Sequence, residues 1–262
     1  MSIEEAAVRP ATATSLTRSA AWDVGRSSGS LIVAWQNPES RLIASVGLLE
    51  HGLECGYRFR YLRRAVDVEG FLPFLSFPAW ERTYTSQRLF PLFSQRIMSP
   101  RRPDFSEFLR QLHLSEDATP WEQLARSEGR STGDTVQVFP IPAVRPDGTT
   151  TCRFLVHGIR YVASSGLSRL TSGDPLTLRD EPENPVNTQA VLVCTHQGEP
   201  LGYVPDLLLE HLRVLQGTAP IELTVEHING PEAPVHLRLL VRLDGEAPAG
   251  YRPMSGSNWQ TF

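Results

Sequence analysis

Apolar and polar residues alternate over short stretches near the start of the chain, as they do in β-strands. Residues 31–35 and 41–46 are apolar runs on either side of an Asn-Pro-Glu-Ser turn, so we predict two strands joined by that turn. In residues 57–61 three aromatic side chains alternate with Arg58 and Arg60, which places the rings on one face of a strand and the guanidinium groups on the other. These strands are predicted to open a packed domain.

The pattern then changes to looped and helical segments. Residues 71–80 hold two prolines among large apolar side chains, so this stretch is predicted to be extended and still packed. Residues 104–114 carry apolar side chains at helical spacing behind Asp104, the predicted cap. A second helix is predicted at residues 120–126, and a strand at residues 135–140 completes the domain.

The second half of the chain consists of short apolar runs separated by tight turns. The predicted strands are residues 154–161, 175–179, 190–194, 201–204, 221–225 and 235–241. Asp206 is predicted to cap a helix in which Leu208, Leu212 and Leu215 share one face. Short strands leave unpaired edges unless the sheet closes, so we predict a small barrel with one packed helix.

These patterns predict an α+β protein of two domains. The predicted organisation is a disordered arm at residues 1–30, a small α+β domain at 31–142, a linker at 143–151, a β-rich domain at 152–244 and a disordered tail at 245–262.

The composition predicts the cellular compartment of the protein. The chain starts without an apolar leader and holds no apolar run of about 18 residues, so we expect a soluble cytoplasmic protein. Three cysteines, Cys55, Cys152 and Cys194, are too few and too scattered for a disulfide framework. Neither Cys55 with His51 nor Cys194 with His196 has the second ligand pair that a structural zinc site requires, so no metal is expected.

Charge is uneven along the chain. All 25 basic residues are arginines; residues 1–145 carry 17 of them against 16 acidic residues, whereas residues 146–262 carry 8 against 13. Proteins that bind nucleic acid usually present a basic face, because neutralising phosphates supplies most of the sequence-independent affinity. The acidic second half therefore argues against strong binding to duplex DNA.

The sequence contains no catalytic motif in the structural context that its chemistry requires. Gly-x-Ser-x-Gly occurs around Ser27 and Ser131, but neither match follows a buried strand and opens a helix, as a nucleophile elbow must. A chain without lysine cannot form the phosphate-binding Gly-x-x-x-x-Gly-Lys loop. We therefore expect a protein that is not an enzyme and holds no cofactor.

The second half resembles the HIRAN domain, which occurs alone in bacteria and attached to helicase-like repair proteins in eukaryotes. The matching segments, in family order and spacing, are residues 156–161, 170–174, 179–185, 190–191 and 201–205. The resemblance implies an OB-like or SH3-like barrel that captures the 3′ end of single-stranded DNA. In such a site aromatic rings stack on the exposed base while polar groups hold the terminal hydroxyl and phosphate.

The resemblance also implies the site residues. Arg160 and Tyr161 match the arginine and the first stacking tyrosine of the family. Where the family has a second ring and a carboxylate, this chain has Val186, which has no π-face, and Asn187, an uncharged acceptor. Tyr203 is the candidate for a substitute ring, and packing in the core is the alternative interpretation of this residue. The predicted nucleic-acid-binding residues are Arg160, Tyr161, Asn187 and Tyr203.

Residues 31–142 resemble the small N-terminal subdomain of HipA-type toxin kinases. The matching segments are residues 46–49, 57–62, 75–78, 89–96 and 136–140, and no kinase catalytic motif follows them. The resemblance implies a regulatory module that docks a protein partner, since free-standing relatives act as antitoxins beside a separately encoded kinase. The predicted partner-binding residues are Arg58, Arg60, Arg63 and Arg64, on and after a strand of alternating aromatics.

Two functions follow from these observations. The first is a non-catalytic binding protein whose barrel binds the ends of single-stranded DNA and whose first domain docks a partner such as a HipA-like kinase. The alternative is an antitoxin-like interaction module that regulates such a kinase without binding nucleic acid. The acidic second half and the Val186–Asn187 pair favour the alternative.

Overall fold

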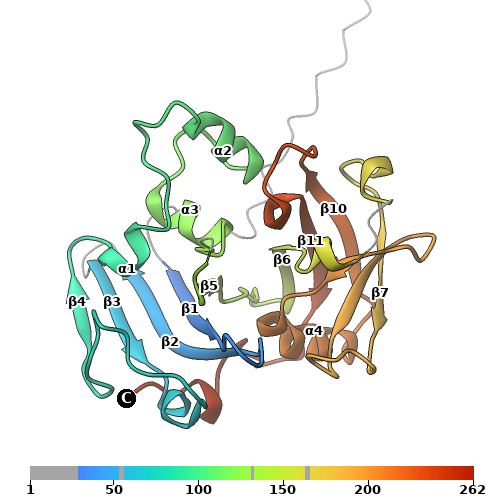
Figure 1. Cartoon of the computed structure of the whole chain (residues 1–262). Helices are drawn as coiled ribbons and strands as arrows, with labels where there is room; N and C mark the ends of the chain where they lie inside the picture. Colours follow the sequence, from blue (N-terminus) through green and yellow to red (C-terminus); the bar gives the residue numbers. More distant parts are fainter. Residues whose placement is uncertain (1–28, 53–55, 131–132, 163–165) are drawn as a thin grey trace, which may run out of the picture.

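Antiparallel sheets supply most of the regular structure of this protein. The computed structural model describes residues 29–52, 56–130, 133–162 and 166–262. It contains one five-stranded sheet in the first half and two three-stranded sheets in the second, with short helices between them (Figure 1). The predicted mixed class, rich in strands, is confirmed. The predicted arm at residues 1–30 falls outside the described residues except for its last two, which begin the first strand.

The first sheet contains the predicted hairpin and the predicted aromatic strand. Its strands, in spatial order, are β4 (Tyr84–Ser86), β3 (Gly56–Tyr61), β2 (Ile43–Gly52), β1 (Gly29–Gln36) and β5 (Val136–Pro140). Within β3, Phe59 and Tyr61 are fully buried, whereas Arg58 and Arg60 are partly exposed. The two faces of β3 therefore differ as the alternation predicts.

A cluster of aromatic rings covers the buried face of this sheet. Phe59 stacks on Phe77 with ring centroids 4.3 Å apart. The Tyr61 hydroxyl donates to the Phe77 carbonyl (2.9 Å) and accepts from the backbone N–H of Phe74 (2.7 Å). Burial raises the pKa of Tyr61, which keeps this phenol neutral and able to donate. Residues 71–80 are thus held against the sheet without regular structure, as their prolines predict.

Short helices follow the strands of the first half. They are η1 (Arg63–Asp67), α1 (Pro91–Ser94), α2 (Phe105–Gln111) and α3 (Pro120–Arg126). α3 begins with a capping box, in which the Thr119 hydroxyl accepts from the Glu122 N–H and the Glu122 carboxylate accepts from the Thr119 N–H. The predicted capping role of Asp104 is wrong, because its carboxylate binds the Arg102 guanidinium instead.

Six strands of the second half close into a ring. One sheet contains β10 (Glu222–Ile228), β11 (Leu239–Glu246) and β6 (Thr149–Leu155), and the other contains β7 (Leu176–Asp180), β8 (Val191–Thr195) and β9 (Pro200–Tyr203). Isolated antiparallel bridges join the sheets at both edges, His157 to Tyr203 on one side and Pro175 to Thr224 on the other. The predicted barrel is confirmed, and its edges are paired.

One helix packs against this barrel. It comprises η4 (Asp206–Leu208) and α4 (Leu209–Gln216), and its side chains Leu208, Leu212 and Leu215 are fully buried. The predicted capping role of Asp206 is wrong. Neither η4 nor α4 begins with a side-chain capping hydrogen bond, and the Asp206 carboxylate accepts a hydrogen bond from Asn187 instead.

Two predicted strands of the barrel are interrupted by 3₁₀ turns. β6 ends at Leu155, and the chain turns at Gly158, whose φ of +67° favours glycine, into η2 (Ile159–Tyr161). A Cβ at Gly158 would lie 2.8 Å from the Tyr203 ring, so a side chain cannot stand there. In the same way η5 (Val235–Leu237) precedes β11 where a single strand was predicted. Two further turns are η3 (Leu167–Arg169) and η6 (Ser257–Trp259).

The two halves share hydrophobic cores, so the predicted linker is wrong. Ile32 and Phe139 of the first sheet belong to the core of the barrel. Leu112, which follows α2, packs with Leu155 and two further leucines of the second half. Within the predicted linker at 143–151, residues 145–148 form a turn and residues 149–151 begin β6.

The segment from 247 to 262, here called the C-terminal segment, is ordered, so the predicted disordered tail is also wrong. Ala247 and Met254 are buried in the barrel core. The segment then returns to the first sheet, where Thr261 pairs with Leu62 and Phe262 packs against the aromatic cluster. Its apolar residues are too widely spaced for a periodic pattern, which is why the sequence did not reveal this packing.

Removal of residues 251–262 tests the role of the C-terminal segment. The truncated protein should lose roughly 3 kcal/mol of unfolding free energy, because several large apolar side chains lose their buried contacts. Urea denaturation followed by tryptophan fluorescence measures this loss. The control is Asn258→Ala, an exposed position of the same segment, which should leave the urea midpoint unchanged. Equal midpoints for the truncated and full-length chains would show that the segment does not stabilise the fold.

His211 gives the fold a predictable acid sensitivity. Its ring is 2% exposed, faces the Tyr251 hydroxyl at 3.3 Å, and burial lowers its pKa from 6.5 to about 4. Because the unfolded chain binds this proton more tightly, stability is complete above pH 6.5 and falls by about 3 kcal/mol as pH falls toward 4. Urea denaturation at several pH values should show a shallower decline for His211→Gln than for the wild type. Parallel declines would contradict the assignment.

Candidate functional site

A groove of about 660 Å³ lies between the two halves. The first half lines it with the β1–β2 turn and with β5, and the barrel lines it with η2, the loop before β8, the end of β9, and η4 and η5. All four residues predicted to bind nucleic acid line this groove, namely Arg160, Tyr161, Asn187 and Tyr203. The structure thus brings together residues that lie up to 43 positions apart in the sequence.

Tyr161 presents its ring to solvent at this groove. The side chain is 74% exposed, and the Arg160 guanidinium carbon lies 5.1 Å from the ring centroid. Both residues stand on η2, where the Tyr161 N–H donates to the carbonyl of Gly158. An exposed ring beside a cation offers a face for stacking and a charge for an anion at one place.

Tyr203 has a more structural position than Tyr161. Its ring is half-buried against the Gly158 turn, and its backbone pairs with His157. Burial, and then a hydrogen bond to Glu181, raise the pKa of its hydroxyl. Tyr203 therefore forms the wall that supports η2, with one edge of the ring facing the groove.

Asn187 holds a carboxylate at the groove. Its side-chain amide donates to Asp206 Oδ1 (2.9 Å), while its own Oδ1 accepts from the Gln189 N–H (2.9 Å). Asp206 also lines the groove. The sequence predicts Asp206 at a helix start and does not indicate its position beside Asn187, because only the folded chain brings residues 187 and 206 together.

Exposed apolar surface of the second half is concentrated here. Its exposed large hydrophobic side chains within the described residues are Tyr161, Val186 and Val235. Tyr161 and Val235 line the groove, and Val186 directly precedes Asn187. Exposed apolar groups around a groove are typical of a binding surface.

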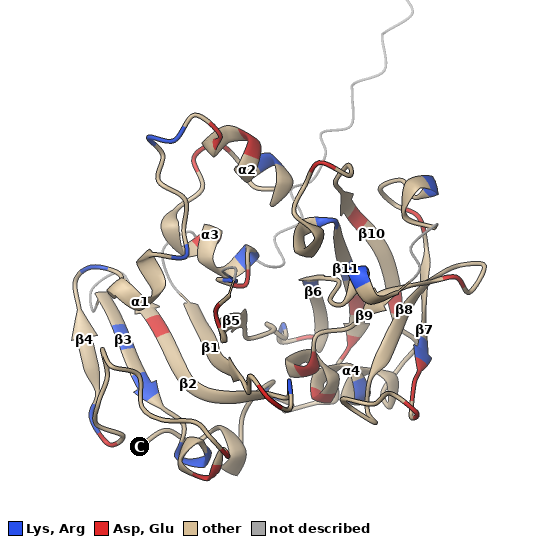
Figure 2. Cartoon of the chain, in the orientation of Figure 1, with Lys and Arg blue, Asp and Glu red and all other residues tan. Residues whose placement is uncertain are grey.

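The groove has an excess of positive charge although the chain is acidic. Arg41, Arg130 and Arg160 line it, against the carboxylates of Asp134 and Asp206. Figure 2 shows that basic and acidic positions are interspersed over both halves of the described part of the chain. The charge count along the sequence missed this local excess, because two of the three arginines belong to the first half.

A buried ion pair joins the halves beside the groove. The Glu128 carboxylate, 4% exposed, lies 2.6 Å from His157 Nε2. Burial alone would raise the pKa of Glu128, but His157, Arg130 and His236 together hold it below its ordinary value. Burial, and next the charge of Arg130, lower the pKa of His236. No sequence motif marks Glu128 or His157, since they come from different halves.

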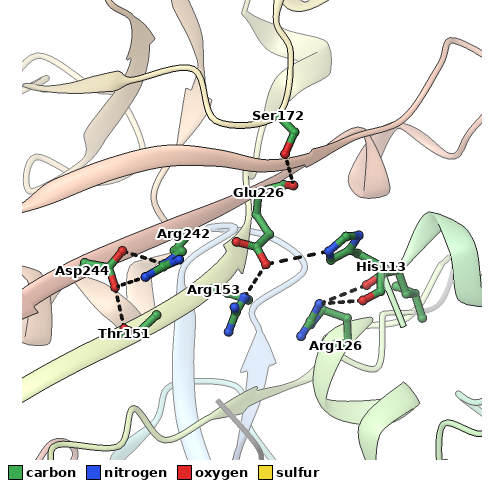
Figure 3. A network of polar contacts seen from close by, with 9 residues as sticks. His113, Arg126, Thr151, Arg153, Ser172, Glu226, Arg242 and Asp244 are labelled. Atoms are coloured by element: carbon green, nitrogen blue, oxygen red, sulfur yellow. Dashed lines mark hydrogen bonds and ion pairs between the residues drawn. The ribbon is translucent and has the colours of Figure 1, made fainter. Parts of the chain in front are cut away.

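A second polar network lies elsewhere between the halves (Figure 3). Glu226 of β10 accepts from Arg153 of β6 (2.8 Å) and lies 3.9 Å from His113, which follows α2. Arg126 of α3 donates to the Leu112 carbonyl (3.1 Å), and burial lowers its pKa to about 10. These charged groups are engaged with one another and connect the halves, and Arg126 and Arg153 also line a small cavity of about 90 Å³.

Three of the four predicted partner-binding arginines contact the chain's own C-terminal segment. Arg60 donates to Glu50 (2.9 Å) and to the Thr261 hydroxyl (2.8 Å), and Arg63 donates to the Thr261 carbonyl. The Arg64 guanidinium carbon lies 5.3 Å from the Trp259 ring centroid. Arg58 stands opposite Glu50 in the strand register and has no contact with this segment among the described residues.

Other candidate residues of the sequence analysis contribute less. Ser27, Ser131 and Cys55 lie outside the described residues. Cys152 and Cys194 are buried, and burial raises the pKa of both thiols. In the described ranges no three His, Cys, Asp or Glu side chains are grouped so as to hold a metal ion, and no helix has the length and apolar character to cross a membrane.

Comparison with known families gives a match to part of the barrel. Residues 150–215, from β6 to α4, match the family model of the HIRAN domain. No curated protein matches the chain. The comparisons give no support to the resemblance of residues 31–142 to the HipA subdomain, which stays a prediction.

Two solved structures are similar to the chain. The HIRAN domain of human HLTF shares 20% identity over 38% of this chain and 80% of its own, with a TM-score of 0.30. A protein from Lactobacillus plantarum shares 22% identity over 38% of this chain and 100% of its own, also with a TM-score of 0.30. On the family match, residues 150–215 form a HIRAN domain, a type of module that generally binds nucleic acid.

Proposed function

We propose that this protein is a non-catalytic nucleic-acid-binding protein whose groove binds an end or an unpaired base of a single strand. The observation that carries the proposal is the exposed Tyr161 ring beside Arg160 at the mouth of the groove. Stacking of one base on an aromatic side chain contributes about 1–3 kcal/mol. The HIRAN match supports the same class of ligand.

The chemistry of the groove favours a single strand over a duplex. A base can stack on Tyr161 only when it is not already stacked inside a helix. Three arginines line the groove, and the second half is acidic overall, so the extended basic surface that grips duplex DNA is missing from the groove walls.

Asp206 supports the binding of a strand end. The family position of a carboxylate is occupied by Asn187, whose amide holds the Asp206 carboxylate at the groove. A carboxylate is a stronger acceptor for a terminal hydroxyl than a neutral amide. We infer that Asp206 replaces the missing charge, so that an end with a 3′-hydroxyl is preferred over one with a 3′-phosphate.

Tyr161→Ala is the direct test of this function. Labelled single-stranded oligonucleotides ending in a 3′-hydroxyl or a 3′-phosphate are titrated, and fluorescence anisotropy gives the dissociation constants. The substitution should weaken binding roughly tenfold or more, because the stacking contribution is lost. Leu75→Ala, a fully exposed apolar position of the first half, is the control and should bind as the wild type does. Absent binding, or equal binding by wild type and Tyr161→Ala, contradicts the proposal.

The non-catalytic part of the proposal has its own test. The wild-type protein should not turn over nucleotide or ester substrates, because neither Gly-x-Ser-x-Gly match occupies a strand-to-helix elbow in the sequence. Product formation is measured for the wild type, Ser27→Ala and Ser131→Ala. Turnover that disappears in either variant would make the protein an enzyme.

A second candidate is a protein-docking role for the first half. It is favoured by Leu72 and Leu75, which are 78% and 100% exposed in the loop before Trp80. An exposed apolar loop is a common feature of protein-binding surfaces. The HipA likeness makes a kinase the partner to test. If the protein only docks a partner and does not bind nucleic acid, the oligonucleotide titration must show no binding.

A further inference from the structure

The walls of the groove belong to different halves of the chain. The β1–β2 turn contributes Arg41, and the loop after α3 contributes Arg130, whereas Tyr161 stands on the barrel. The HIRAN match begins at residue 150, so both of these arginines lie outside the matched domain. A ligand that fills the groove therefore meets residues that the domain alone does not provide.

The two walls are fixed relative to each other. Ile32 and Phe139 of the first sheet are part of the barrel core, and the buried Glu128–His157 pair joins the halves beside the groove. Separation of the halves would leave the buried Glu128 carboxylate without this partner and would expose the shared core, so it is strongly unfavourable. A strand whose base lies on Tyr161 is consequently held near the first-half wall.

Arg41 and Arg130 have guanidinium groups available for a ligand. Among the described residues neither side chain has a hydrogen bond or an ion pair. Other arginines are paired: Arg96 with Asp134, and Arg213 with Asp180. Because Arg96 neutralises Asp134 at the same wall, the first-half side of the groove presents the guanidinium groups of Arg41 and Arg130, and the Arg130 charge also lowers the pKa of the buried Glu128.

The backbone holds Arg41 in a defined place. Asn37 Oδ1 accepts from the backbone N–H groups of Glu39 and Ser40, and the Gln36 side chain donates to the Arg41 carbonyl (2.9 Å). Arg41 has a φ of +64°, a left-handed conformation that is unfavourable for a residue with a side chain. Arginine therefore stands where glycine would be conformationally preferred, as is typical of functional positions.

We propose that the nucleic-acid site is composite, with Arg41 and Arg130 of the first half binding backbone phosphates of the strand whose base stacks on Tyr161. The inference rests on the proposed function and extends it to the phosphate contacts. The barrel binds the base, and the first sheet and its loops bind the phosphodiester groups. The ligand is a single strand several nucleotides long, since one base and two separate phosphate contacts extend over more than a terminal nucleotide.

The test is the salt dependence of binding by the full chain. Dissociation constants are measured between about 50 and 200 mM salt for Arg41→Gly, Arg130→Ala and the double variant. Each lost phosphate contact should lower the slope of log affinity against log salt by about 0.7, and thus by about 1.4 in the double variant. Arg41→Gly relieves the left-handed strain, so a loss of binding in this variant does not come from misfolding.

Two controls separate the contacts from net charge. Arg88→Ala with Arg101→Ala removes the same charge at exposed positions away from the groove and should keep the wild-type slope. Tyr161→Ala should weaken binding while its slope stays that of the wild type, because stacking releases no counterions.

The outcomes distinguish the two proposals. If the wild type binds, Tyr161→Ala weakens binding, and the Arg41–Arg130 double variant keeps the wild-type slope, the composite site is overturned and the proposed function stands. If no oligonucleotide binds, the proposed function fails and the composite site with it. If the double variant has a reduced slope with both DNA and RNA oligonucleotides, the result supports contact with the phosphodiester that both share. If its slope is reduced with only one of them, the result supports the contact and identifies that type of strand as the ligand.

Discussion

The buried contact between Glu128 and His157 is the constraint on which the arrangement of this protein depends. One partner comes from the loop after α3 and the other from the bridge between the two barrel sheets. A carboxylate with 4% exposure is tolerated only when hydrogen bonds and opposite charge stabilise it, and Glu128 has the contact with His157 and the nearby charge of Arg130. Together with the shared hydrophobic cores and the Glu226 network, this contact holds the first half against the barrel. The groove lies beside this junction, and its lining comes from both halves.

Local patterns were sufficient to predict most individual elements. The β1–β2 hairpin, the two faces of β3 and the helix α3 each depend on residues close together in sequence. The two interrupted strands, by contrast, depend on distant contacts. The Tyr203 ring requires glycine at position 158, which turns the chain into η2, and nothing within residues 154–161 indicates that ring. The absence of a linker has the same origin, because Ile32 and Phe139 belong to a core built mainly by the other half.

The candidate site was predictable only where a family resemblance supplied it. Arg160, Tyr161, Asn187 and Tyr203 all line the groove, although Tyr203 has a largely structural position. Asp206 could not be recognised, because its relation to Asn187 exists only in the folded chain. The charge balance of each half, likewise, gave no indication of the groove. A count along the sequence assigns Arg41 and Arg130 to the first half, whereas the fold places them opposite the barrel.

The C-terminal segment has a consequence for how the chain acquires its structure during synthesis. Thr261 pairs beside β3, and Phe262 packs among rings that belong to residues 57–93. These residues emerge from the ribosome after all strands of both halves. The aromatic cluster of the first sheet therefore stays incompletely covered while the barrel is translated. Its last contacts form only when the C-terminal segment reaches the first sheet, which closes a loop of roughly 200 residues. Such non-local contacts form slowly, so the first half has an interval in which a chaperone can bind its exposed rings.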